Sequence, residues 1–203
     1  MLGRDSDYFQ ELQTQTDWSR TLYGFALWCS PIAGWLTLDV GCGPGLLPAI
    51  FSKLGCRAVG VDLDLEMFHP APLHSIVTVA NVYALPFKFK SFDLITASNL
   101  VFLLSEPAQA LHDMNRFLRP GGKFAMLNPS EFLNEQAALA FANEKGLDGM
   151  ARDTLLNWAR RAVENHHWTE DETCDLYRRA GMKYMGSASK VGLGFGRFSW
   201  GTV

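Results

Sequence analysis

The stretch LTLDVGCGPGLLPAIFSKL at residues 36–54 decides the fold of this chain. Residues 36–40 form the short apolar run of a buried β-strand, and three glycines follow it within five residues. Residues 46–54 then have the apolar pattern of a helix, with Pro48 in the first turn and Gly55 at the end. The stretch therefore predicts a strand, a tight glycine turn and a helix.

The same alternation of strand and helix continues to about residue 130. Three further β-rich runs are almost continuously hydrophobic, which is typical of strands covered on both faces of a parallel sheet: 58–63, 76–80 and 92–98. A helix and a fifth strand complete the pattern, separated by an RPGG turn at residues 119–122: 105–118 and 123–129.

The chain after residue 129 predicts three helices and a closing hairpin. The helices are expected at 131–145, 151–167 and 169–181, with Thr169 as the cap of the last one. The segments 182–189 and 197–203 predict the two strands of the hairpin. One crossover in a parallel sheet needs only about a dozen residues, so the additional helices are candidates for a functional role.

Composition indicates one globular domain of 203 residues. Hydrophobic residues make up 48% and charged residues 19%, which is enough apolar material for a core. A formal charge of -3 disfavours nucleic acid as a partner. The uncharged run 21–38 contains glycine, serine and proline, so it predicts a buried helix, a turn and a strand rather than a membrane span. The N-terminus lacks the positive leader of a signal peptide, and we expect a cytoplasmic protein.

The four cysteines do not indicate a disulfide framework or a zinc site. They stand too far apart for any CxxC pair: Cys29, Cys42, Cys56 and Cys174. His69 and His74 are expected to be surface loop residues, and no metal site is predicted.

The glycine turn and an acidic residue after it predict a nucleoside site. Gly41, Gly43 and Gly45 lack Cβ atoms, so the backbone can approach a ligand closely. Asp62 ends the second strand 21 residues after Gly41, at the spacing of a carboxylate that accepts hydrogen bonds from a ribose. A turn packed for purely structural reasons is the alternative, and these features alone do not distinguish a dinucleotide from another nucleoside.

Two positions favour a ligand with an amino-acid tail over a dinucleotide. The dinucleotide fingerprint GxGxxG needs glycine where Leu46 stands. Asp39, two residues before the first glycine, would repel a pyrophosphate but can receive an ammonium group.

Five motifs in order resemble the class I S-adenosylmethionine-dependent methyltransferases, especially the small-molecule, type 11-like group. The residues that carry the resemblance cover about 36–130: LDVGCGPG at 38–45, VGVDLD at 59–64, ANVYALPF at 80–87, FDLITASN at 92–99 and FLRPGGKFAMLNPS at 117–130. The resemblance implies a Rossmann-like α/β fold, an open twisted sheet of seven strands in the order 3-2-1-4-5-7-6. Five strands would be parallel, the last two would form the antiparallel hairpin, and helices would cover both faces.

The resemblance also implies the position of the cofactor, S-adenosyl-L-methionine, whose product is S-adenosyl-L-homocysteine. Asp39 and the backbone of Gly41, Cys42 and Gly43 would hold the methionine part. Gly45 would permit the helix to approach.

The ribose and adenine positions follow from the later motifs. Asp62 would bind the ribose diol, Leu63 would pack on adenine, and Ser98 would line the methionine side. Asn81 departs from the family's frequent aspartate, although its amide oxygen can still accept from the adenine amino group. Val82 would offer its backbone amide to the ring.

The domain prediction is a single methyltransferase domain over 1–203. Within it, residues 1–35 are expected to form an N-terminal helical cap, and 130–168 a helical insertion that acts as the acceptor lid. Several aromatic residues are candidates for the pocket wall: Tyr8, Phe9, Trp18, Tyr23, Trp28, Phe132, Trp158 and Trp168. We expect Trp28 and Trp158 to be core residues, and Tyr8 and Trp18 to belong to a mobile cap.

Methyl transfer from a sulfonium needs no side-chain nucleophile, so the sequence is expected to show a cofactor site without a catalytic motif. His166 and His167 are candidate general bases, or simply imidazoles at a helix C-terminus. Other candidates for contact with the acceptor are Asn128, Ser130 and a basic group that could equally be a solvated face: Arg152, Arg160 and Arg161.

The leading hypothesis is therefore an enzyme that methylates a small molecule. A non-catalytic protein that binds the cofactor or its product is an alternative, and a nicotinamide-dependent dehydrogenase is a weaker one. The acceptor, its reacting atom and the oligomeric state are left open.

Overall fold

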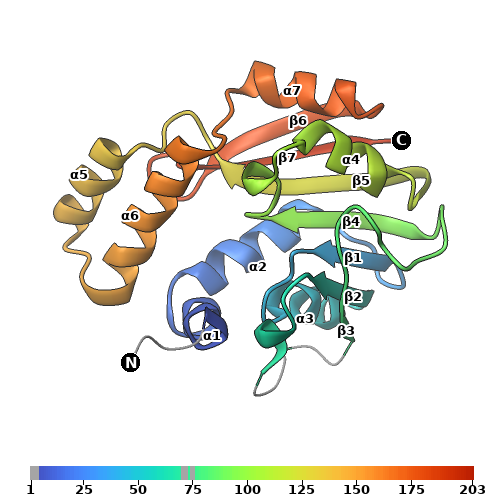
Figure 1. Ribbon diagram of the computed structural model, residues 1–203, viewed down its shortest axis with the longest axis horizontal. Helices are drawn as coiled ribbons and strands as arrows, with labels where there is room; N and C mark the ends of the chain where they lie inside the picture. Colours follow the sequence, from blue (N-terminus) through green and yellow to red (C-terminus); the bar gives the residue numbers. More distant parts are fainter. Residues whose placement is uncertain (1–4, 70–72, 74–75) are drawn as a thin grey trace.

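The computed structural model describes residues 5–69, 73 and 76–203, and within them it shows a twisted seven-stranded sheet (Figure 1). The strand order is β3-β2-β1-β4-β5-β7-β6. The first five strands run parallel, while β7 is antiparallel to both β5 and β6, which confirms the predicted topology. The strands are β1 (Leu36–Val40), β2 (Arg57–Asp62), β3 (Val77–Val79), β4 (Phe92–Ser98), β5 (Leu118–Pro129), β6 (Lys183–Lys190) and β7 (Gly196–Thr202).

Helices cover both faces of this sheet. Within the described residues they are α1 (Asp5–Gln15), α2 (Trp18–Trp28), α3 (Leu46–Lys53), α4 (Pro107–Asn115), α5 (Glu135–Lys145), α6 (Gly149–Glu164) and α7 (Glu170–Arg179), with two short 3-10 turns, η1 (Leu65–Phe68) and η2 (Val101–Leu103). Figure 1 shows α5 and α6 side by side beyond the end of the sheet, away from the layers formed by the other helices.

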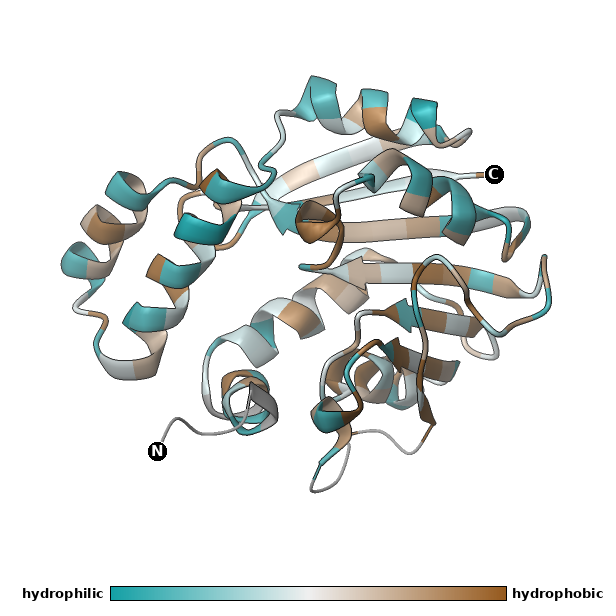
Figure 2. Cartoon of the chain, viewed as in Figure 1, coloured by the Kyte–Doolittle hydropathy of each residue, from teal (hydrophilic) through white to brown (hydrophobic). Residues whose placement is uncertain are grey.

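The alternation of side chains along the strands creates two cores. Leu38 and Val40 of β1 face a cluster that includes buried residues of α4 and α7. Residues of the opposite face, such as Leu94 and Phe198, pack with α2 and α3. Figure 2 shows apolar residues gathered along the central strands, whereas α7 is mostly hydrophilic because only one of its sides meets the sheet. The pattern of period two in a strand thus places Thr37 and Asp39 on the α2–α3 side.

Several boundaries differ from the predicted ones for local reasons. The helix expected from residue 131 begins at Glu135, because the Asn134 side chain accepts from the Ala137 amide and caps it. The RPGG segment at 119–122 lies inside β5, where a register shift between Phe92 and Leu94 accommodates it. Thr169 caps α7 as predicted, in a reciprocal capping box with Glu172.

The described part of the predicted N-terminal cap, residues 1–35, is divided between a covering helix and a core helix. Leu22, Phe25 and Ala26 of α2 are buried in the core against α3 and the sheet, so α2 belongs to the body of the domain. Helix α1 and the first turns of α2 lie in the position expected of a covering element. None of the described helices is both long and apolar enough to cross a membrane.

Two glycines, one with open space around it and one packed tightly, allow a test of this packing through protein stability. A Cβ at Gly24, within α2, would meet nothing within 4 Å, whereas a Cβ at Gly201 would lie 2.6 Å from the Tyr177 ring. Gly24→Ala is expected to raise the unfolding free energy by about 0.5–1 kcal/mol, because glycine within a helix costs backbone entropy. Gly201→Ala is expected to lower it by about 1–3 kcal/mol through overpacking. Chemical denaturation of both variants measures this, and equal effects would contradict the packing described.

Candidate functional site

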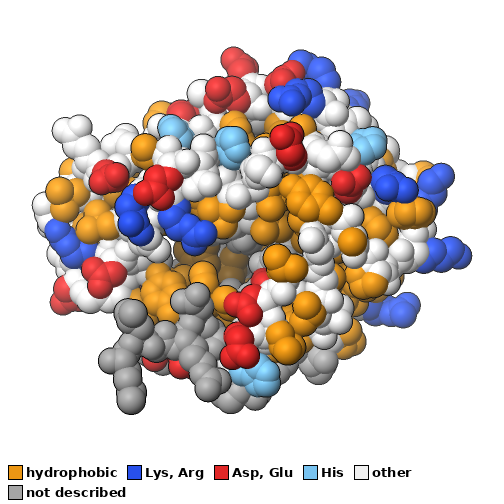
Figure 3. All heavy atoms as spheres, in the orientation of Figure 1, with side chains coloured by type: hydrophobic (Ala, Val, Ile, Leu, Met, Phe, Trp, Pro, Cys, Tyr) orange, Lys and Arg blue, Asp and Glu red, His pale blue; other side chains and the backbone are white. Residues whose placement is uncertain are grey.

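A large cavity opens at the carboxyl ends of β1, β2 and β4. Its volume is about 1420 Å³, and its lining comes both from the glycine turn after β1 and from the helices α1, α2, α5 and α6. Figure 3 shows it as a hollow in the middle of this face, with hydrophobic side chains inside it. The end of the sheet where ligands bind in open α/β folds is therefore covered by the N-terminal helices and by two helices that follow β5.

The glycine turn forms one wall of this cavity. Gly41 and Gly43 both have a left-handed backbone, with φ of 72° and 52°, and both line the cavity. A Cβ at Gly41 would also lie 3.1 Å from the Leu100 side chain. The Gly43 amide donates to Asp62 Oδ2 at 2.8 Å, which ties the turn to the end of β2. The Asp62 carboxylate therefore lies beside the turn and fixes its Gly43 amide.

Asp39 places a buried carboxyl group under the turn. The residue is 2% exposed, yet it lines the cavity. Its Oδ1 accepts from Thr96 Oγ1 at 2.7 Å across the β1–β4 pair. Burial raises the pKa of Asp39 to about 8, the Thr96 hydrogen bond opposes this shift, and the charge of Asp62 adds to it. The carboxyl is therefore mostly neutral at pH 7, and a cationic ligand group would favour its ionised form.

Cys42 completes the turn as a small residue in a crowded position. Its thiol packs so closely against β2 that a Cβ at Gly60 would lie 2.8 Å from the sulfur. Burial raises the pKa of the Cys42 thiol, with Asp39 and Asp62 adding to the shift. The thiol is therefore protonated, and the residue contributes its backbone and its small size.

Gln13 of α1 is a site residue that the sequence analysis missed. It is buried and lines the cavity, and its Oε1 accepts from the Leu46 amide at 3.3 Å. This bond satisfies one of the free amides at the N-terminus of α3. On the same helix, the Tyr8 hydroxyl is 2.8 Å from Thr154 Oγ1 of α6. Helix α1 thus spans the cavity from the glycine turn to α6.

Asn99, directly after Ser98, is a second missed residue. Both line the cavity at the end of β4. Asn99 has a left-handed backbone with φ of 54°, and within the described residues its buried Oδ1 has no hydrogen-bond partner. Asparagine tolerates this conformation better than most residues, and the motif at 92–99 that contains it is the signal that could have indicated it.

Four residues expected to contact the cofactor lie outside the lining of the cavity. Gly45 has a φ of 96° and caps α3. Leu63 is 67% exposed at the end of β2. The Asn81 Oδ1 accepts from the Tyr83 amide at 3.0 Å, and Val82 packs against the core of the α4 side. The cavity lining therefore brings together Asp39, the glycine turn, Asp62 and Ser98. The cofactor roles of the four residues outside the lining stay predictions.

The opposite wall of the cavity is aromatic. Phe9, Trp18 and Trp158 line it, and the rings of Trp18 and Trp158 pack edge to face with centroids 5.6 Å apart. Trp158 is therefore a wall residue rather than the purely core residue we expected. The Trp18 and Tyr8 positions agree with a cap over the cavity.

Other candidates for contact with an acceptor are held in structural bonds. Asn128 Oδ1 accepts from the Phe102 amide at 3.2 Å, and the Ser130 hydroxyl donates to the Gly194 carbonyl at 2.6 Å. Neither residue lines the cavity, so the expectation that they face it is wrong. His166 stacks on Trp168, and His167 Nδ1 lies 3.1 Å from the Ala162 carbonyl at the end of α6. Both histidines also lie outside the lining, which removes the geometric basis for a general base there.

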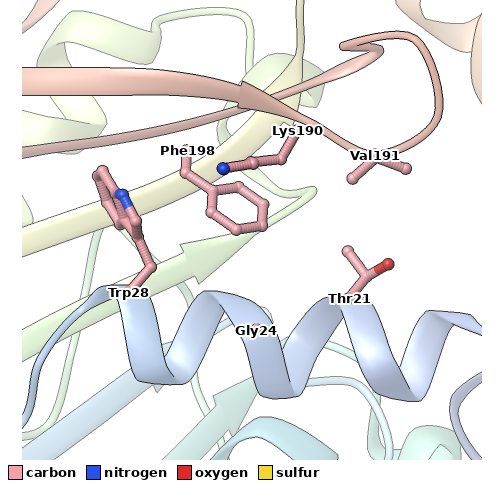
Figure 4. A pocket seen from close by; sticks show the side chains of 6 residues that line it. All are labelled: Thr21, Gly24, Trp28, Lys190, Val191 and Phe198. Carbon is pink, nitrogen blue, oxygen red and sulfur yellow. The ribbon is translucent and has the colours of Figure 1, made fainter.

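A smaller hollow of about 370 Å³ adjoins the cavity between α2 and the β6–β7 hairpin (Figure 4). Figure 4 shows Thr21 and Trp28 projecting from one face of α2 toward Lys190, Val191 and Phe198. Thr21 and Val191 line both spaces. The two hollows are therefore neighbours separated by these two side chains.

The described residues contain no cluster of histidine, cysteine, aspartate or glutamate that could hold a metal ion. His69 is exposed, as expected, and His74 lies outside the described residues. The four cysteines are free thiols.

Comparisons with known proteins agree with this arrangement. A family model described as a methyltransferase domain matches residues 38–126. The ubiquinone biosynthesis O-methyltransferase of Pseudoalteromonas translucida is 30% identical over 102 residues, which are 45% of this chain and 43% of that protein. The protein of the same name from Ruegeria pomeroyi is 26% identical over 185 residues, which are 84% of this chain and 67% of that protein.

A solved structure shares the fold over most of both chains. The S-adenosylmethionine-dependent methyltransferase from Mesorhizobium loti superposes with a TM-score of 0.63 at 18% identity, covering 88% of this chain and 95% of that one. The match to the first of these relatives spans less than half of that protein's length. The family model falls on the turn and strands that build the cavity wall, so residues 38–126 of this chain match a methyltransferase domain of the type 11 group.

Proposed function

We propose that this protein transfers a methyl group from S-adenosyl-L-methionine to a small-molecule acceptor. The observation that carries the proposal is the pair of carboxyl groups, Asp39 and Asp62, on either side of a left-handed glycine turn at the cavity wall. Names of relatives such as ubiquinone biosynthesis O-methyltransferase support the same reaction class.

The residues present fit this cofactor. Asp39 offers a buried carboxyl group for the ammonium of the methionine tail, and the glycines leave the backbone accessible beside it. Asp62 stands at the end of β2, within reach of a ribose that lies over the turn. Ser98 closes the same wall from β4.

The same wall disfavours a dinucleotide. A pyrophosphate beside the turn would meet the Asp39 carboxyl group, and the Leu46 amide at the N-terminus of α3 already donates to Gln13 Oε1. These contacts support the adenosyl cofactor over a nicotinamide cofactor.

The cofactor supplies an activated methyl group, and the chain has to position the acceptor and exclude water. Helices α1, α5 and α6 cover the cavity and give it an aromatic wall, which suits an organic acceptor. We assign the acceptor lid to α5 and α6, within the 130–168 insertion, together with α1. The presence of this second wall favours an enzyme over a protein that only binds the cofactor.

The state of the cysteines supports a proposal about the cellular compartment. Cys29, Cys42 and Cys56 are buried free thiols, and burial raises the pKa of each. Free thiols are typical of proteins in a reducing compartment. We therefore propose that the protein works in the cytoplasm.

Thermal unfolding with three ligands tests the cofactor. At about 100 times the dissociation constant, S-adenosylhomocysteine is expected to stabilise the protein by about 2.7 kcal/mol and to raise Tm by about 5–10 °C. S-adenosylmethionine should act alike and NAD should not. Asp62→Ala is expected to abolish the Tm shift. Asp62→Asn keeps an oxygen that accepts from the Gly43 amide, so its Tm shift measures the effect of removing the charge alone. A shift with NAD only would contradict the proposal.

Asp39→Asn is expected to raise stability and weaken cofactor binding. The folded chain keeps a proton on Asp39 that the unfolded chain releases, so the wild type loses stability as pH rises from about 4 to 8. The variant avoids this loss, and its Tm at pH 8 should be higher by about 4 °C or more. Its affinity for S-adenosylhomocysteine should fall at least about tenfold through loss of the charge.

Asp93→Asn is the matched control for this variant. The Asp93 carboxylate is paired with Arg119 at 2.7 Å and accepts from the Leu36 amide, away from the cavity. This change should lower Tm and leave the affinity for S-adenosylhomocysteine unchanged. A less stable Asp39→Asn protein would show that Asp39 is ionised in the free enzyme.

A further inference from the structure

Carboxylates line both walls of the cavity, whereas the basic residues of its lining lie on the helical side. Asp39 and Asp62 lie on the glycine-turn side, where the proposed cofactor brings its positive charges. Lysine and arginine line the helical side, and Figure 3 shows basic side chains over α6 at the edge of the hollow. The basic residues of that lining are Arg20, Lys145 and Arg161.

Two of these cations already have carboxylate partners. Arg20 is paired with Asp17 at 3.0 Å, and Lys145 with Glu144 at 2.7 Å. Both pairs are well exposed to solvent. These two residues therefore have little unsatisfied charge to offer a ligand.

Arg161 differs from them in its position and its surroundings. It is half-buried on α6 and lines the cavity, and within the described residues its guanidinium has no ion pair or hydrogen bond. Asp148 lies on the same wall but 13 residues earlier on the chain, which is about 20 Å along a helix axis. Glu164 follows Arg161 by three residues on α6, but within the described residues no ion pair joins the two side chains, and the Arg161 charge faces the cavity.

An aromatic surface lies next to this charge. Trp158 precedes Arg161 by three residues, so the two side chains share one face of α6. Trp18 packs edge to face against Trp158 from α2. A planar ring with an anionic substituent would contact this aromatic wall and the guanidinium together, and the planar fork of arginine matches a carboxylate.

We propose that the methyl acceptor is an aromatic carboxylate whose anionic group binds Arg161 and whose ring packs against Trp18 and Trp158. This proposal rests on the proposed methyl transfer and names its substrate class. Arg161 is a specificity residue here, since it binds the end of the acceptor that lies on the α6 side, across the cavity from Asp39 and Ser98.

Calorimetry with a charged and a neutral probe tests this class. The protein is first saturated with S-adenosylhomocysteine, and the dissociation constants of 2-naphthoate and of 2-naphthamide are then measured. The wild type should bind the carboxylate at least about tenfold more tightly than the amide, because a charge-assisted bond replaces a neutral one. Arg161→Gln should remove this preference, and Arg161→Lys should keep part of it.

Arg160→Gln is the matched control. Arg160 is the next residue, exposed, bonded to Asn157 Oδ1 at 2.8 Å and absent from the cavity lining. This variant should keep the full preference for the carboxylate. Each variant must still bind S-adenosylhomocysteine as the wild type does, which separates a local effect from a loss of folding.

The outcomes separate the two proposals. A protein that does not bind S-adenosylhomocysteine contradicts the proposed function itself. A protein that binds it but binds 2-naphthoate no better than 2-naphthamide, or not at all, overturns the aromatic carboxylate alone. A preference that survives in Arg161→Gln also overturns it.

Discussion

The burial of the Asp39 carboxyl group at the end of β1 is the constraint on which the site depends. A carboxyl group in this position is costly unless it is neutral or paired, and its hydrogen bond from Thr96 makes it part of the contact between β1 and β4. The β1–β4 pair lies in the middle of the sheet. On one side of β1 the order continues to β2 and β3, and on the other side to β4 and β5. The domain therefore holds a destabilising group at the point where the proposed cofactor needs a counter-charge.

The surrounding contacts keep this group accessible to a ligand. Asp62 fixes the glycine turn through the Gly43 amide, and Gln13 covers the N-terminus of α3. Helices α5 and α6 add a wall that the sheet does not need for its own packing, since they form a separate small core. The wall proposed for the cofactor is thus built from adjacent strand ends, and the wall proposed for the acceptor from helices distant in sequence.

This division explains what the sequence could predict. The glycine turn, Asp39 and Asp62 follow from local spacing along one strand–turn–helix unit, so both the fold and half of the site could be inferred. Gln13 could not be inferred, because its place in the cavity depends on how α1 crosses the sheet. Arg161 was one of three candidate arginines, and the sequence could not tell which of them faces the cavity. The same limit explains the wrong expectation for Asn128 and Ser130, whose side chains bond neighbouring backbone instead of facing the cavity.

Proton release on cofactor binding tests the role of Asp39 most directly. Titration calorimetry with S-adenosylhomocysteine at pH 7, in two buffers of different ionisation enthalpy, counts the protons exchanged. A pKa of about 8 in the free protein predicts that nearly one proton is released per ligand bound, and that Asp39→Asn releases none. Absence of proton release from the wild type, or equal release from both proteins, would contradict a neutral buried Asp39 that ionises to receive the ammonium group.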